Sequence, residues 1–219
     1  MVKAIEYANL ASEVYESHTH AIDQKTLPGW YVIKGLHLDD ESAIFGKGKW
    51  GTSGLQGRAF YHKRGDMVIA FKGTNITMAS DLYADLKIVA YRVPTQATQA
   101  VRLVKDWKAK FPRTRVSLVG HSLGGAICQI AGLATDTKFV TFGAPGMHHN
   151  AIGLCAFKKL LNTSKAGVNY ANVGDMISWG HHIGHTEWCY VGVATHRIVK
   201  WITYMECNDF GEKDPLTLI

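Results

Sequence analysis

The sequence predicts a single α/β domain in which a mainly parallel central sheet is covered by helices on both faces. Three observations support this fold class. Short apolar runs typical of buried strands alternate with longer runs that have helical spacing. One strand-sized run, Val116–Val119, leads through a glycine-rich turn into a long apolar run. The 219 residues contain no repeat or linker that marks a boundary, so 1–219 is expected to be one domain.

Hydrophobic periodicity predicts the elements that precede the glycine-rich turn. The run Met67–Phe71 is almost entirely apolar, so its strand should lie in the middle of the sheet. In chain order, the expected elements are the helix Val2–His18, the strands Trp30–Leu38, Ser42–Phe45, Leu55–His62 and Met67–Phe71, and the helix Pro94–Phe111.

The second half of the chain repeats the alternation of helices and strands. The partly acidic tail, Glu206–Ile219, is expected to lie on the surface. The expected elements are the helix Ala126–Ala134, the strand Lys138–Gly143, the helix Ala151–Leu161, the strands Val168–Val173 and Thr186–Val193, and the helix Thr195–Met205.

Composition narrows the classes of function. The net charge of +6 favours anionic surfaces such as phospholipid headgroups, but no basic block is long enough to indicate nucleic acid. No stretch approaches the roughly 20 apolar residues of a membrane span. The first residues lack the apolar core of a signal peptide, so a cytoplasmic protein or a non-classical export route is expected. The four cysteines match no zinc or thioredoxin spacing and are expected to be reduced.

The glycine-rich turn carries the strongest chemical motif. Gly120-His121-Ser122-Leu123-Gly124 fits G-x-S-x-G, and its position between a strand and a helix is typical of a nucleophile elbow. Such a turn lifts the Ser122 hydroxyl out of the sheet. It also leaves the Leu123 N–H at a helix N-terminus, where it can face a developing oxyanion. The motif therefore predicts Ser122 as a nucleophile.

A nucleophilic serine needs a base, and the base needs an acid that orients it. Asp175 follows a predicted strand downstream of the elbow and is the expected acid. Four histidines follow it, and His196 is favoured as the base, with His185 as the alternative. His181, His182 and His185 also suggest a metal site, but no cysteine or carboxylate stands at a familiar zinc spacing. No metal is therefore expected.

These motifs together resemble the class 3 lipases, the fungal-type triacylglycerol lipases of the α/β-hydrolase fold. Val116–Gly125 matches the serine signature of that family throughout. Other segments resemble family motifs in the family's order, namely Phe71-Lys-Gly-Thr74, Asp81–Leu86, Thr141-Phe-Gly-Ala-Pro145 and Gly184-His-Thr-Glu-Trp188.

The resemblance implies a role for each matching residue. Ser122, Asp175 and His196 would form a catalytic triad. The backbone N–H groups of Thr74 and Leu123 would form the oxyanion hole. A short lid over residues 75–83 would offer an apolar face to lipid through Ile76, Met78, Leu82 and Tyr83.

The expected activity is that of a serine carboxylic-ester hydrolase, a lipase or esterase that cleaves acyl esters such as glycerides through an acyl-enzyme on Ser122. No metal or organic cofactor is expected, and contact with a lipid interface would be transient. Two alternatives remain. One is a phospholipase or acylhydrolase that acts on membrane lipids, and the other is a hydrolase-fold binding protein without turnover.

Overall fold

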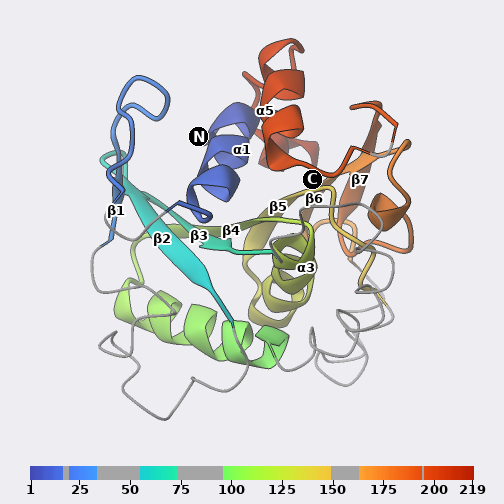
Figure 1. The fold of residues 1–219 in the computed structure, drawn as a ribbon. Helices are drawn as coiled ribbons and strands as arrows, with labels where there is room; N and C mark the ends of the chain where they lie inside the picture. The colour runs from blue at the N-terminus through green and yellow to red at the C-terminus, as the bar shows by residue number, and fades with distance from the viewer. Residues whose placement is uncertain (17–19, 34–54, 74–95, 149–162, 194) are drawn as a thin grey trace.

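In the computed structural model, the chain is built around one seven-stranded sheet (Figure 1). The structure describes residues 1–16, 20–33, 55–73, 96–148, 163–193 and 195–219. The predicted strand Ser42–Phe45, the predicted helix Ala151–Leu161 and the end of the predicted strand Trp30–Leu38 lie outside these residues.

The spatial order of the strands follows their order in the chain. β1, β2 and β3 pair antiparallel, whereas β3 to β7 pair parallel. The mainly parallel sheet is therefore confirmed, and the carboxyl ends of five strands meet at one edge. The strands are β1 (Trp30–Val32), β2 (Gly57–His62), β3 (Asp66–Phe71), β4 (Arg115–His121), β5 (Lys138–Phe142), β6 (Gly167–Asn172) and β7 (His185–Cys189).

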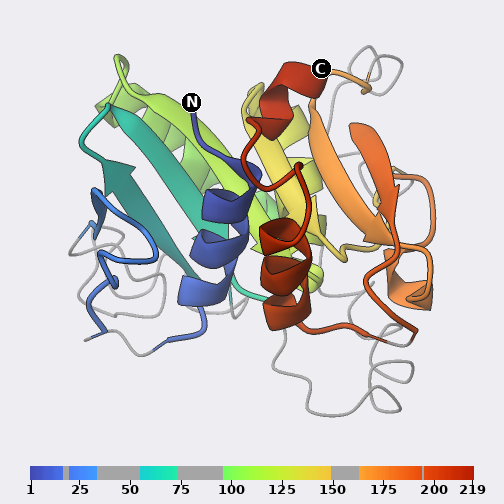
Figure 2. The same cartoon turned by 90° about the horizontal axis from the view of Figure 1, so that it is seen from above.

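Helices cover both faces of the sheet, as predicted. α1 (Ala4–Glu13) and α5 (Ile198–Glu206) pack side by side on one face, and Figure 2 shows them in front of the strands. α3 (Leu123–Thr135) and the helical residues 96–110 cover the other face (Figure 1). Two apolar cores result, one on each face, and every residue of β3 is buried between them. Among the described residues, no helix is long and apolar enough to span a bilayer.

The last residues of the chain pack against the rest of the domain more closely than their acidic composition predicts. Most of the tail lies on the surface, but Gly211 and Pro215 are buried. The first N–H groups of a helix have no acceptor within the helix. In α1 the N–H of Ala4 donates to the Lys213 carbonyl (2.8 Å) and that of Ile5 to the Gly211 carbonyl (3.0 Å). A short 3₁₀ helix, η3 (Pro215–Leu218), then contacts β5 and β6.

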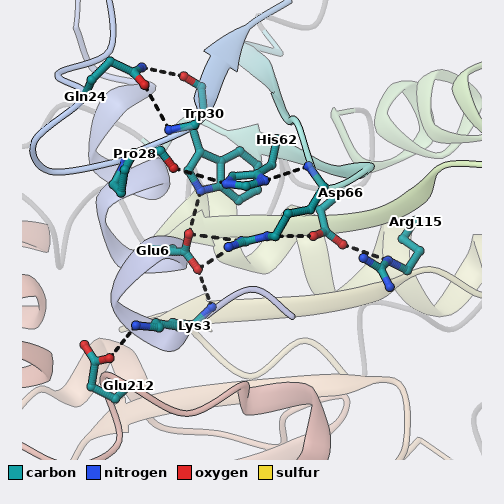
Figure 3. A network of polar contacts seen from close by, with 11 residues as sticks. Lys3, Glu6, Gln24, Pro28, Trp30, His62, Asp66, Arg115 and Glu212 are labelled. Atoms are coloured by element: carbon teal, nitrogen blue, oxygen red, sulfur yellow. Dashed lines mark hydrogen bonds and ion pairs between the residues drawn. The ribbon is translucent and has the colours of Figure 1, made fainter.

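A polar network fixes the other side of α1 (Figure 3). The Glu6 carboxylate accepts from the Trp30 indole N–H (2.8 Å) and from the Lys3 backbone N–H (2.8 Å). Arg64 lies between Glu6 and Asp66, and Asp66 also accepts from Arg115 at 2.9 Å. These contacts join α1 to β1, β3 and β4, so the first helix is held in a defined position against the sheet.

Two elements near the carboxyl edge are shorter than predicted. β7 ends at Cys189 rather than Val193 because its only neighbour in the described residues, β6, ends at Asn172, the partner of Cys189. α5 begins at Ile198 rather than Thr195. Residues 190–193 and 195–197 therefore belong to a connection at the carboxyl edge, and His196 lies in that connection rather than in a helix.

Candidate active site

Ser122 lies on a strained turn between β4 and α3. Its φ of 57° and ψ of −127° are rare for a residue with a side chain, and strain of this kind costs on the order of 1–3 kcal/mol. The strand and the helix nearly touch at this turn. A Cβ on Gly120 would overlap the backbone of Gly124, and a Cβ on Gly124 would overlap the Phe71 carbonyl. The glycines of the predicted elbow are thus required by close backbone approach.

The structure brings Ser122, His196 and Asp175 together in one hydrogen-bonded chain. Ser122 Oγ lies 2.7 Å from His196 Nε2, and His196 Nδ1 lies 2.5 Å from Asp175 Oδ2. An ionised carboxylate only accepts hydrogen bonds, so Nδ1 carries the proton and donates to Asp175. Nε2 is then the acceptor for the serine hydroxyl, which is the arrangement in which an imidazole can act as a general base.

Asp175 is buried and held by three kinds of contact. It is the N-cap of the short 3₁₀ helix η2 (Met176–Ser178), and its Oδ1 accepts from the Ile177 N–H at 3.1 Å. Its Oδ2 accepts from the Ser178 hydroxyl at 3.2 Å as well as from His196. Both carboxylate oxygens therefore have donors, which orients the carboxylate toward the imidazole.

A second histidine packs against the first. The ring of His121 lies 4.8 Å from that of His196, and the His121 side chain is buried. Burial lowers the pKa of His121 well below its usual range, and the neighbouring His196 lowers it further. His121 is therefore neutral near pH 7.

One half of the expected oxyanion hole lies in the described part of the chain. Leu123 is the first residue of α3, so its N–H is at the helix N-terminus beside Ser122. Gly73 lies alongside, since a Cβ built on it would be 3.3 Å from Ser122 Cβ. Thr74 follows Gly73 but lies outside the described residues, as do the expected lid residues Ile76, Met78, Leu82 and Tyr83.

The alternative base and the histidine cluster are engaged elsewhere. His185 Nε2 contacts Glu187 Oε1 at 2.5 Å, and its side chain is 41% exposed to solvent. His182 Nε2 contacts the Ser178 carbonyl at 2.8 Å, and the His181 ring packs edge-on against His148. Across the described residues, no group of three or more histidine, cysteine or acidic side chains is arranged to hold a metal ion.

The sequence analysis predicted no role for two residues beside the site. The Tyr15 hydroxyl accepts from the Gly73 N–H at 3.1 Å, so the turn that follows α1 supports the segment that leads to Thr74. The Asn172 side chain is buried and hydrogen-bonded to four backbone groups close to Asp175 and His196. A signal existed for Asn172, because an asparagine in a buried strand must find partners. No sequence pattern marks Tyr15.

The chain is similar in sequence to known phospholipases. A family model described as Tle-like phospholipase domain matches residues 6–185. The extracellular phospholipase A1 of Serratia liquefaciens is 32% identical over 130 residues, which is 58% of this chain. The matched region spans 40% of the length of that relative.

Solved structures of fungal lipases share the fold. Lip2 lipase from Yarrowia lipolytica superposes with a TM-score of 0.53 at 17% identity, covering 84% of this chain and 76% of that one. A deletion mutant of the Rhizomucor miehei lipase propeptide complex gives 0.57 at 15% identity, covering 84% and 65%. The similarity to the fungal-type lipases expected from the motifs is thus confirmed at the level of the fold. Since the family model covers most of the sequence, the chain belongs to the Tle-like phospholipase domain family.

Proposed function

We propose that this protein is a serine hydrolase that cleaves the acyl esters of phospholipids. The observation that carries the proposal is the hydrogen-bonded chain from Ser122 Oγ to His196 Nε2 (2.7 Å) and from His196 Nδ1 to Asp175 Oδ2 (2.5 Å). The strained turn that presents the serine and the helix N-terminus beside it support the same chemistry.

The geometry supports a two-step reaction. His196 Nε2 takes the proton of the Ser122 hydroxyl as Oγ attacks the ester carbonyl, and Asp175 stabilises the imidazolium that forms. The Leu123 N–H, together with that of Thr74 in the proposed oxyanion hole, stabilises the tetrahedral oxyanion. His196 then protonates the leaving alcohol, and an acyl-enzyme on Ser122 remains. Water repeats the sequence and releases the fatty acid.

The rim of the site supports a lipid substrate. Large apolar side chains follow the carboxyl ends of β6 and β7, on the connections that carry Asp175 and His196. They are exposed to solvent, with Tyr190 at 64% and Val193 at 73%, and the others are Val173, Met176 and Trp179. Exposed aromatic and aliphatic residues beside a site are suited to contact with an acyl chain or a lipid surface.

The phospholipid is favoured over the glyceride by the family model and by the named activity of the Serratia relative. The fungal lipases share only the fold, and their low identity carries no argument for the substrate. Phosphatidylcholine carrying a label on one acyl chain or the other would separate the two ester positions. Triacylglycerol emulsions provide the comparison, because glycerides are the competing class of substrate.

The test is hydrolysis of phosphatidylcholine vesicles and of p-nitrophenyl esters from acetate to palmitate by wild type and three variants. Ser122→Ala and His196→Ala should lose at least about a thousandfold in kcat, because triad members act as a unit. His185→Ala is the matched control, since it removes an imidazole that lies at the start of β7 and contacts Glu187 instead, and it should retain most of the activity.

Each outcome has a distinct meaning. Loss of activity in His185→Ala but not in His196→Ala would overturn the assignment of the base. Turnover of triacylglycerol that far exceeds turnover of phospholipid would return the substrate to the glycerides. Saturable lipid binding by wild type without any hydrolysis would show a binding protein with a hydrolase fold.

A further inference from the structure

Asn172, the last residue of β6, is fully buried, and its side-chain amide makes four hydrogen bonds to the backbone. Nδ2 donates to the carbonyl oxygens of Gly192 (2.9 Å) and Thr195 (3.3 Å). Oδ1 accepts from the N–H groups of Gly174 (3.2 Å) and Val191 (3.1 Å). A primary amide offers two donors and two acceptor sites, so its capacity is fully used.

These partners lie directly beside the triad. Gly174 precedes Asp175, and Thr195 precedes His196. The backbone carbonyl of Asn172 also accepts from the Asp175 N–H at 3.0 Å. One residue therefore joins the connection that carries the acid to the connection that carries the histidine.

We infer that Asn172 is a positioning residue that sets the contact between Asp175 and His196, an inference that rests on the proposed function. The two connections leave neighbouring strands and are irregular, so backbone pairing within the sheet does not fix their relative position. The amide supplies that constraint by binding both at once. Displacing a catalytic group by about 1 Å can cost about a hundredfold in rate, so a residue that fixes this distance affects turnover without touching substrate.

Asn169 provides a matched control on the same strand. It is equally buried, and its Nδ2 donates to the carbonyl oxygens of Ile183 (2.8 Å) and His185 (3.1 Å). Its Oδ1 accepts from the Thr141 hydroxyl at 2.7 Å. Asn169 thus makes the same kind of contacts, but to the segment that enters β7 rather than to the connections that carry the triad.

The experiment compares Asn172→Ala with Asn169→Ala in the full chain, at a temperature well below both unfolding transitions. Asn172→Ala should lower kcat by about 10- to 100-fold with little change in KM, and Asn169→Ala should not. The acidic limb of the pH–rate profile should also move to lower pH in Asn172→Ala alone. The reason is that a loosened Asp175 contact stabilises the protonated imidazole less.

A spectroscopic measurement does not depend on the activity. The His196 Nδ1 proton, in a contact of 2.5 Å, should give a far-downfield proton NMR signal in wild type and in Asn169→Ala. Asn172→Ala should lose or shift this signal. If Asn172→Ala does not fold, Asn172→Asp carries the test, because it removes the donors to Gly192 and Thr195 and keeps an acceptor.

The outcomes separate this inference from the proposed function. An unchanged signal and unchanged kcat in the Asn172 variants would overturn the positioning role. Equal losses of kcat in Asn172→Ala and Asn169→Ala would overturn it too, since they would reflect stability alone. A downfield signal that depends on Asn172 in a protein without ester hydrolysis would support the inference and reject the proposed function.

Discussion

At the scale of single residues, buried polar groups lie one contact away from the proposed triad. The Tyr15 hydroxyl holds the Gly73 N–H, and His121 packs its neutral ring against His196. Neither side chain would touch the scissile ester in the proposed reaction. Tyr15 supports the segment that leads to Thr74, and His121 packs against the proposed base, so their effects are expected in turnover or in stability rather than in substrate affinity.

Tyr15→Phe should lower kcat by about three- to tenfold with little change in KM. The change leaves the Gly73 N–H without its acceptor, and an unpaired buried donor costs about 1–3 kcal/mol. Burial raises the pKa of Tyr15 to about 12, so the neutral hydroxyl is present throughout the assay range. Steady-state kinetics on a soluble ester measures the effect.

The matched control is Tyr7→Phe. Tyr7 lies on α1, and its hydroxyl hydrogen-bonds Ser117 Oγ at 2.9 Å, near the start of β4 and away from the site. Tyr7→Phe should lower the free energy of unfolding by a similar amount and leave kcat unchanged. A wild-type kcat in Tyr15→Phe would contradict the view that the Tyr15 hydroxyl supports Gly73 in a way that turnover requires.

The buried His121 makes stability fall in acid. Its pKa in the folded protein lies well below the value of about 6.5 of the unfolded chain, so the unfolded state takes up the proton first. This contribution to stability is complete above pH 6.5. It decreases by up to about 1.4 kcal/mol per pH unit as the pH falls below that value.

Urea unfolding at several pH values between about 4.5 and 7 measures this dependence, and His121→Asn should make it shallower. Tyr7→Phe is the control here as well, because it removes no group that titrates in this range and should shift the whole curve by a constant amount. An unchanged slope in His121→Asn would contradict a neutral buried His121.

At the scale of elements, the contact between β4 and α3 decides the shape of the elbow. Gly124 lies where the first turn of α3 passes the end of β3, so that backbone atoms of both elements meet. Ser122 is held at a positive φ by this packing, since the strand, the helix and the Phe142 carbonyl, which accepts from the Ser122 N–H at 3.1 Å, all constrain it.

Gly124→Ala should destabilise the protein by about 3 kcal/mol or more, because the new methyl group would overlap the Phe71 carbonyl. Gly65→Ala is the comparison, since Gly65 has a φ of +90° but no atom within 4 Å of the added Cβ. It should cost only about 1–2 kcal/mol for the backbone conformation. Thermal unfolding of both variants measures their losses of stability. Equal losses would argue against steric overlap at this turn.

At the scale of the whole molecule, charge and exposed apolar surface act together. The chain carries a net charge of +6, and the apolar rim lies at the carboxyl edge of the sheet, on the connections that carry Asp175 and His196. A positively charged molecule is attracted to anionic lipid, and the rim can then contact the acyl region. The proposed phospholipid substrate fits both features.

Hydrolysis of vesicles should therefore depend on their charge and on salt. Vesicles with about one quarter phosphatidylglycerol should be cleaved faster than pure phosphatidylcholine at low salt. The difference should shrink as added salt shortens the Debye length from roughly 30 Å at 0.01 M to about 3 Å at 1 M. A neutral soluble ester is the control, and a vesicle preference that persists at 1 M salt would exclude long-range attraction as its cause.

The pattern of residues within each segment determined most of the fold. Apolar runs such as Met67–Phe71 specify buried strands wherever they are placed, and the glycines at positions 120 and 124 specify a tight strand-to-helix turn. The strand-to-helix turn at Ser122 could therefore be predicted directly, because its sequence pattern is short and contiguous. The ends of β7 and α5 were not, since they depend on where β6 stops.

Only the tertiary structure decided which distant groups meet. Four histidines follow Asp175 in the sequence, and it is the path from β7 to α5 that brings His196 to Ser122. His185 stays on β7, where it contacts Glu187 two residues along the same strand. The same holds for Tyr15 beside Gly73 and for the tail that caps α1. Local sequence determines what each segment can form, whereas contacts between segments far apart in the chain depend on how the whole sheet packs.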